Sequence, residues 1–75
     1  MLEMFLRYSG LALSVTADYS GAKASIPGLK IKNTEGTPYA VGNTVDVAIE
    51  TLRRKLVGQV VQFETDGENK ELIFS

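Results

Sequence analysis

The residues that most suggest a binding chemistry are basic. They fall into two groups along the chain: Lys30, Lys32, Arg53, Arg54 and Lys55. Such a set could neutralise the phosphates of a nucleic-acid strand, and an exposed ring such as Tyr39 could stack on its bases. The chain as a whole is not basic, because eight basic residues face nine acidic ones and the formal net charge is −1. Residues 53–55 are therefore more typical of a solvated helix end than of a nucleic-acid groove.

Catalytic chemistry has few candidates in this sequence. The chain contains no cysteine and no histidine, which excludes Cys–His and Ser–His–Asp nucleophiles as well as thiolate and imidazole ligands for zinc. Four carboxylates surround a predicted turn at residues 66–67: Glu64, Asp66, Glu68 and Glu71. Paired carboxylates can hydrolyse glycosides, but carboxylates beside such a turn are normally solvated, and this group lacks the spacing of a calcium loop. We expect a protein that is not an enzyme and holds no metal or cofactor.

A third candidate site is the start of a predicted helix at Gly42-Asn43-Thr44. The free N–H groups there could receive an anion, such as the phosphate of a small ligand. Helix capping by Asn43 or Thr44 is the commoner role for these residue types. The segment also lacks the glycine pattern of a phosphate-binding loop.

The segment that must organise these residues is a helix over residues 43–57. Its apolar residues recur at helical spacing along one stripe: Val45, Ala48, Ile49, Leu52 and Leu56. Asp46 lies near the positive end of the helix dipole and residues 53–55 near its negative end. Gly58 follows the last turn and can adopt the left-handed conformation that ends helices. We expect this helix to cover one face of a sheet.

The rest of the chain alternates apolar and polar residues in short runs, which predicts strands. Residues 2–8, 11–19 and 22–26 predict an antiparallel meander joined by Ser-Gly turns, residues 29–32 and 37–41 a small hairpin, and residues 60–65 and 71–75 a hairpin about Asp66-Gly67. The expected fold is a single α+β domain over residues 1–75, with a mainly antiparallel sheet in the order β-β-β-hairpin-α-β-β and one helix on one face. The alternative is a small five-stranded barrel with a helix between its third and fourth strands.

Several short motifs resemble the HicB-like antitoxin domain. They are Tyr19, the run Ala24-Ser25-Ile26-Pro27-Gly28-Leu29, and Gly42-Asn43-Thr44 leading into Ala48 and Leu52. The resemblance covers roughly residues 11–57. It implies a small inhibitor that neutralises a toxin nuclease by direct contact and assembles into oligomers.

The leading functional hypothesis is a binding or inhibitor protein that acts by contact, as small antitoxins and phage-encoded anti-defence proteins do. The expected contact surfaces are an exposed sheet face with Phe5, Ser14 and Thr16, the region around Tyr39, and the C-terminal edge with Ile73. The alternatives are a single-stranded nucleic-acid module, or capture of a small phosphorylated ligand between protomers by residues such as Thr44 and Arg54.

The size of the chain bears on its partners and its location. Seventy-five residues without a disulfide form a small core, and such folds often gain stability from self-association, so we expect a homo-oligomer. No signal-peptide pattern and no apolar run of about 18 residues occurs. We therefore expect no membrane association and a cytoplasmic location.

Overall fold

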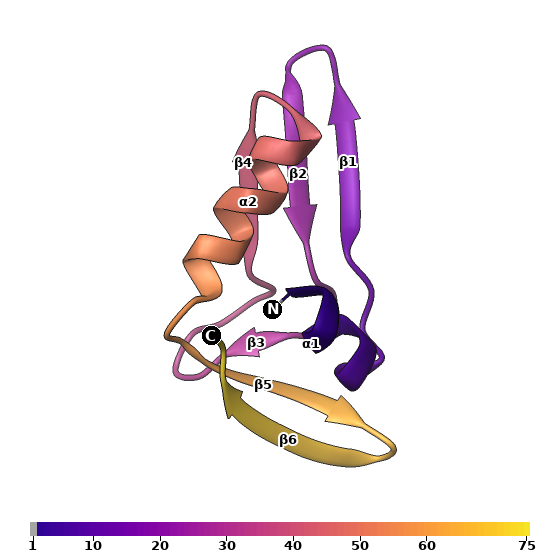
Figure 1. Cartoon of the computed structure of the whole chain (residues 1–75), viewed down its shortest axis with the longest axis vertical. Coiled ribbons are helices and arrows are strands. Elements are labelled where there is room, and N and C mark those ends of the chain that lie inside the picture. Colours follow the sequence, from indigo (N-terminus) through magenta and orange to yellow (C-terminus); the bar gives the residue numbers. More distant parts are fainter. Residues whose placement is uncertain (1) are drawn as a thin grey trace.

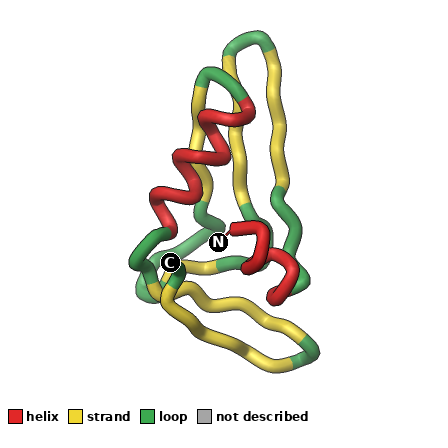
Figure 2. The backbone as a smooth tube through the Cα atoms, viewed as in Figure 1, coloured by secondary structure: helices red, strands yellow, loops and turns green. Residues whose placement is uncertain are grey.

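A computed structural model describes residues 2–75 as two helices and two three-stranded antiparallel sheets. In chain order the elements are α1 (Leu2–Ser9), β1 (Ser14–Asp18), β2 (Gly21–Ser25), β3 (Lys30–Ile31), β4 (Tyr39–Gly42), α2 (Val45–Leu56), β5 (Val60–Thr65) and β6 (Glu68–Ile73). The strand orders are β1-β2-β4 and β3-β5-β6 (Figures 1 and 2). The α+β class is thus confirmed, with two helices in place of the single one expected.

Helix α2 forms where the sequence predicts it. The Oγ1 atom of Thr44 caps its start by accepting the N–H of Val47 at 3.2 Å. Gly58 follows its end with a φ of 82°, in the left-handed region that ends helices. Ala48, Leu52 and Leu56 are completely buried and Ile49 is half-buried, so this part of the predicted apolar stripe packs on the protein. Val45, at the start of the stripe, is exposed.

The sheet beneath α2 presents small side chains to it. In the observed register Ala22 lies opposite Gly42, and Ala24 lies opposite Ala40; the three alanines are buried. Helix α2 passes in front of β4 and β2 and leaves β1 uncovered (Figure 1). The two elements approach each other closely at Gly42, where an added Cβ would lie 2.6 Å from Cγ1 of Val47 and 2.7 Å from the backbone nitrogen of Ala48. A glycine is therefore required at this end of β4.

An aromatic cluster joins the second sheet to α1. The ring of Phe5 meets Phe63 edge to face at 5.2 Å and Phe74 at 5.4 Å between centroids. All three side chains are buried and belong to one hydrophobic core with the residues under α2. The N–H of Gly58 also donates to the carbonyl of Phe74 at 2.7 Å, which ties the end of α2 to the end of the chain.

The strand predicted at residues 2–8 is wrong, because this segment is helix α1. Its buried residues are Leu2, Phe5 and Ser9, which are spaced as one face of a helix. A short apolar run fits both the strand period and the helix period, so its tertiary contacts determine which of the two forms. In this segment Phe5 packs against Phe63 and Phe74. Phe5 is only 2 % exposed, so it does not belong to an exposed sheet face as expected.

The hairpin predicted within residues 29–41 is also wrong. Strand β3 pairs with β5, and β4 pairs with β2, so the two arms belong to different sheets. The turn at residues 32–38 directs the second arm to the row of alanines in β2, where Ala40 and Gly42 fit under α2. The alternative five-stranded barrel does not form either, because the described strands make two separate open sheets.

Within residues 2–75, neither helix is long and apolar enough to cross a membrane.

Candidate binding surface

An open surface built from regular structure is the face of the β1-β2-β4 sheet that points away from α2, named here the outer face. Side chains alternate across a sheet, and residues paired across strands share a face, which assigns to the outer face Ser14, Thr16, Asp18, Lys23, Ser25, Tyr39 and Val41. Tyr39 is 49 % exposed and Val41 is 61 % exposed. Of this set only Ser25 is even half-buried. Among residues 2–75, no element therefore covers the outer face.

Tyr39 is held at the corner where the outer face meets the free edge of β4. The Nζ atom of Lys23 lies 4.7 Å from the centroid of the Tyr39 ring, and that of Lys55 lies 5.1 Å from it. Lys55 Nζ also donates to the carbonyl oxygen of Tyr39 at 3.0 Å. Each cation–π contact is worth about 0.5–1 kcal/mol at an exposed site. The ring is thus fixed in place by two ammonium groups that themselves remain accessible.

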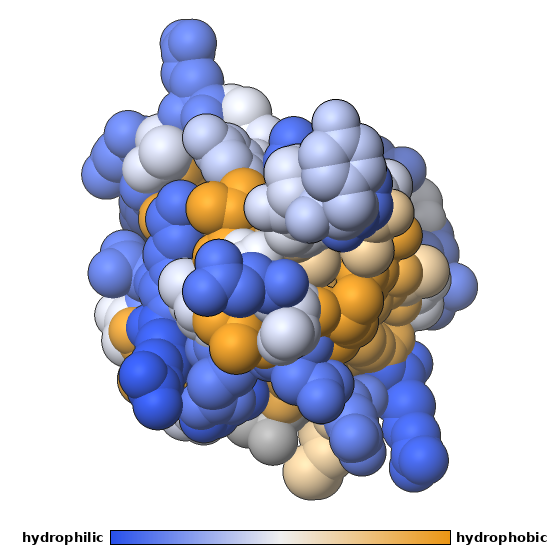
Figure 3. Space-filling view, turned by 90° about the horizontal axis from the view of Figure 1, so that it is seen from above, coloured by the Kyte–Doolittle hydropathy of each residue, from blue (hydrophilic) through white to orange (hydrophobic). Residues whose placement is uncertain are grey.

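Two hollows border the β1-β2-β4 sheet, one at its far end and one at this corner. An open depression of about 560 Å³ lies toward the β1–β2 turn and includes Thr16, Lys23 and Val41 of the outer face. A smaller one of about 120 Å³ lies between the loop at residues 34–38, Tyr39 and Lys55. In the space-filling view onto the β1–β2 end of the molecule, hydrophobic residues are exposed among hydrophilic ones (Figure 3). With Val41 exposed and Lys23 beside the Tyr39 ring, the outer face combines a hollow, an apolar contact and a positive charge.

The turn beside the larger depression carries an ordered carboxylate. Oδ1 of Asp18 accepts from the N–H of Ser20 at 2.7 Å and from its Oγ at 2.6 Å. The hydrogen bond from the Ser20 hydroxyl is the largest cause that lowers the pKa of Asp18 below its ordinary value, and the bond from the Ser20 N–H adds to it. Asp18 is therefore a fixed negative charge at the tip of the hairpin.

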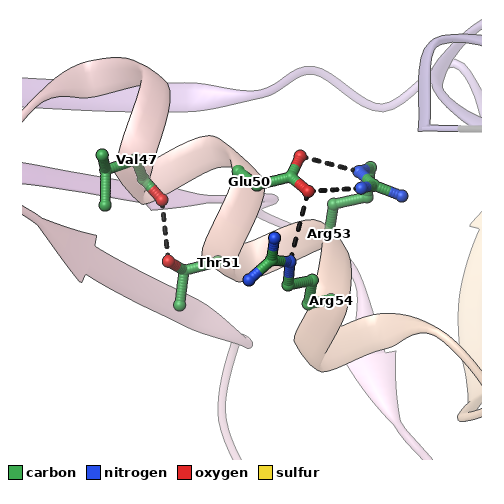
Figure 4. A network of polar contacts seen from close by, with 5 residues as sticks. All are labelled: Val47, Glu50, Thr51, Arg53 and Arg54. Carbon is green, nitrogen blue, oxygen red and sulfur yellow. Dashed lines mark hydrogen bonds and ion pairs between the residues drawn. The ribbon is translucent and has the colours of Figure 1, made fainter.

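The basic residues predicted on α2 are largely engaged by an acid on the same helix. Glu50 accepts from the guanidinium groups of Arg53 and Arg54, the latter at 3.3 Å (Figure 4). The hydrogen bond from Arg53 is the main cause that lowers the pKa of Glu50, and it raises the pKa of Arg53 in turn. Arg53 and Arg54 thus form a local network with Glu50.

The two lysines predicted from the earlier segment lie with the other sheet. Lys32 Nζ lies 3.4 Å from Glu71, and Glu71 also accepts from Nε2 of Gln62 at 2.9 Å. The amide of Gln62 is the larger cause that lowers the pKa of Glu71. Lys30 borders an open depression of about 490 Å³ on the β5–β6 hairpin. The predicted basic set is therefore divided between the two sheets.

Of the seven residues predicted as a site, the structure brings Tyr39 and Lys55 into direct contact and joins Arg53 to Arg54 through Glu50. The hydroxyl of Thr44 is occupied by its capping bond. The prediction missed Lys23, although its alternation with Ala22 and Ala24 already places it on the outer side of a strand. The four carboxylates near residues 66–67 lie along the β5–β6 hairpin. Within residues 2–75 no group of acidic residues could hold a metal ion.

No family model, curated protein or solved structure matches the chain. The resemblance to the HicB-like antitoxin domain stays a prediction from its motifs. Most apolar residues of those motifs have a packing role here: Ala24, Ile26, Leu29, Ala48 and Leu52 are all in the core.

Proposed function

We propose that this chain is a non-enzymatic binding protein that contacts a protein partner through its outer face. The observation that carries the proposal is the uncovered sheet face with Tyr39 fixed between Lys23 and Lys55. A tyrosine ring offers a large, rigid contact area with few torsions to freeze, and small hydroxyl residues beside it offer adaptable hydrogen bonds. Thr16 and Ser14 supply such hydroxyls on the neighbouring strands.

The charge of this surface indicates the kind of partner. Lys23 and Lys55 place two positive charges at Tyr39, and Val41 adds an exposed apolar contact in the adjacent position. The complementary surface is acidic with an apolar centre, because opposite potentials speed association and select the partner. An inhibitor of the antitoxin or anti-defence kind would act in this way, by covering a functional surface of its target.

Capture of a partner tests this proposal. The tagged protein is used to retain proteins from the cells that produce it, in parallel with Tyr39→Ala and Lys23→Glu. The matched control is Lys30→Glu, which makes the same charge reversal on an exposed residue of the other sheet. We expect a protein retained by the wild type and by the control but lost from both outer-face variants. Equal retention by all four chains would refute the assignment of the surface.

A single-stranded nucleic acid is the second candidate, and the same corner favours it. An aromatic ring beside cations is the element on which such proteins stack bases. Titration with a labelled oligonucleotide separates the two candidates, because nucleic-acid affinity falls steeply and linearly in log–log form as salt increases. Binding at low salt that Tyr39→Ala abolishes would favour the nucleic acid, and no binding even at low salt would remove it.

A further inference from the structure

Four strands form the edges of the two sheets, and three of them have features that hinder pairing with another chain. Strand β3 has only two residues. Strand β6 carries Glu68, Lys70 and Glu71. At β4 the ammonium of Lys55 occupies the carbonyl of Tyr39, directly after Pro38. Short length, charged side chains and proline are the usual ways in which proteins protect sheet edges.

Strand β1 has none of these protections. Its sequence is Ser-Val-Thr-Ala-Asp, all five residues are exposed, and its one charge is at the last position. Among the strands of residues 2–75, it has a partner only on its β2 side. In the tube view its outer side faces no other element (Figure 2). An unprotected, exposed edge of this kind is a template for strand addition.

The register shows which backbone groups this edge offers. Asp18 pairs with Gly21 across a two-residue turn. The residues that close such a turn are a hydrogen-bonded pair, because the C=O of the first residue accepts the N–H of the fourth. Pairs alternate along an antiparallel ladder, so Thr16 also bonds to β2. The N–H and C=O groups of Val15 and Ala17 therefore point away from β2, along the free edge.

We propose that β1 pairs antiparallel with β1 of a second copy, about a two-fold axis at Thr16. In this register Val15 of each copy exchanges backbone hydrogen bonds with Ala17 of the other, and the two Thr16 side chains meet at the axis. Ser14 lies opposite Asp18, so no like charges face each other. A symmetric dimer requires one patch that complements itself, and β1 meets that requirement in both its backbone and its side chains.

The proposed dimer extends the sheet to six strands and keeps both α2 helices on one face. Val15 and Ala17 share a face with Ala24 and Ala22, which lie under α2. The dimer therefore places a strip of Val15 and Ala17 from both copies between the two helices. On the opposite side the outer faces become continuous, which gives the dimer two Tyr39 corners. A pair of short strands buries less than a standard interface of about 1,600 Å², so we expect a dimer of about micromolar affinity.

A single new cysteine tests the register, because the chain has no cysteine of its own. At the axis, a Thr16→Cys pair would have Cα atoms about 4.5 Å apart in a non-hydrogen-bonded pair, within the range of a disulfide. The control is Ser14→Cys on the same face of β1, where the two cysteines of a dimer would be separated by four residue steps, about 13 Å. Under mild oxidation at about 100 μM we expect Thr16→Cys to crosslink at least ten times faster than Ser14→Cys. Equal rates would overturn the proposed pairing.

Light scattering on the unmodified chain gives an independent readout. We expect the mass to rise from the 8.2 kDa of one chain toward twice that value with increasing concentration. Thr16→Lys and Thr16→Glu should each remain monomeric, because like charges then meet at the axis, and an equimolar mixture should restore the dimer. A wild-type monomer throughout this range would overturn the proposal, as would a dimer that both variants retain. Neither test depends on the partner proposed for the outer face.

Discussion

The side-chain ammonium of Lys55 donates a 3.0 Å hydrogen bond to the carbonyl oxygen of Tyr39. This contact joins the last turn of α2 to the free edge of β4, and it places the same ammonium near the Tyr39 ring. One lysine thus fixes the helix against the sheet, protects a sheet edge and contributes positive charge to the outer face.

Replacing Lys55 with methionine should lower the free energy of unfolding by about 1 kcal/mol, because a charge-assisted hydrogen bond is lost while much of the aliphatic stem remains. Urea denaturation followed by circular dichroism measures this change. Arg54→Met is the control on the adjacent helix position: its ion pair with Glu50 is exposed, and we expect a smaller loss. Equal effects of the two changes would contradict a specific role for the contact with Tyr39.

Gly42→Ala should destabilise the protein by about 1–3 kcal/mol, since the added methyl group has no space between β4 and α2. The nearest atoms, Cγ1 of Val47 and the nitrogen of Ala48, would lie at 2.6 and 2.7 Å. Val41→Ala, on the exposed face of the same strand, should change stability by less than about 0.5 kcal/mol. Thermal and urea unfolding of both variants decide this, and a neutral Gly42→Ala would show that α2 does not pack so closely on β4.

Phe74→Ala should cost about 3–5 kcal/mol, because it leaves a cavity in the aromatic cluster with Phe5. Phe74 is completely buried, whereas the neighbouring Ile73 is 67 % exposed. Ile73→Ala is therefore the control, with an expected loss below about 1 kcal/mol. Small domains have only about 5–15 kcal/mol of total stability, so Phe74→Ala should show a much lower urea midpoint. Similar midpoints for the two variants would contradict the packing of α1 against the second sheet.

The stability of the fold should fall as the pH is lowered into the acidic range. Hydrogen bonds from Arg53, from Gln62 and from the Ser20 hydroxyl are the main causes that lower the pKa values of Glu50, Glu71 and Asp18, respectively, in the folded protein. The unfolded chain then binds more protons than the folded one, so stability rises with pH through this range. The contribution of these carboxylates to stability is fully present above their ordinary pKa values, and it is lost as the pH falls through the lowered pKa values of the folded protein.

The test is to compare the wild type with Glu50→Gln by urea denaturation between about pH 2 and 7. The variant should show a weaker dependence on acid pH, because one of the contributing carboxylates is absent. The control is Glu3→Gln, which makes the same exchange on α1, outside the Glu50 network. Identical profiles for all three chains would contradict the role of the Glu50 network.

The elements that could be predicted from the sequence are those whose local signals and packing agree. Helix α2 has a cap at Thr44, a stripe that ends in Leu56 and a stop at Gly58, and all three are observed. The Asp66-Gly67 turn likewise joins β5 to β6. The prediction was wrong where contacts between distant residues determine the structure. Residues 2–9 form a helix whose Phe5 packs on Phe63, and β4 pairs with β2, where Ala40 lies opposite Ala24.

For the candidate site, too, the residues could be predicted from the sequence but their contacts could not. Tyr39 and Lys55 were predicted separately, but their contact spans 16 residues and depends on how α2 lies on β4. Charge alone also could not show that Arg53 and Arg54 are engaged by Glu50. Lys23 was missed because a single lysine in a short strand carries no motif. The contact of Lys23 with the Tyr39 ring depends on the pairing of β2 with β4, which the sequence does not show.

Lysine footprinting of the isolated complex shows directly whether the outer face is the surface that binds a partner. Amine acylation followed by mass spectrometry compares each lysine in the free and bound protein. We expect the partner to protect Lys23 and Lys55, the two lysines at the Tyr39 ring, while Lys30 and Lys70 on the other sheet react as before. Unchanged reactivity of Lys23 and Lys55 together with protection of Lys30 and Lys70 would contradict it.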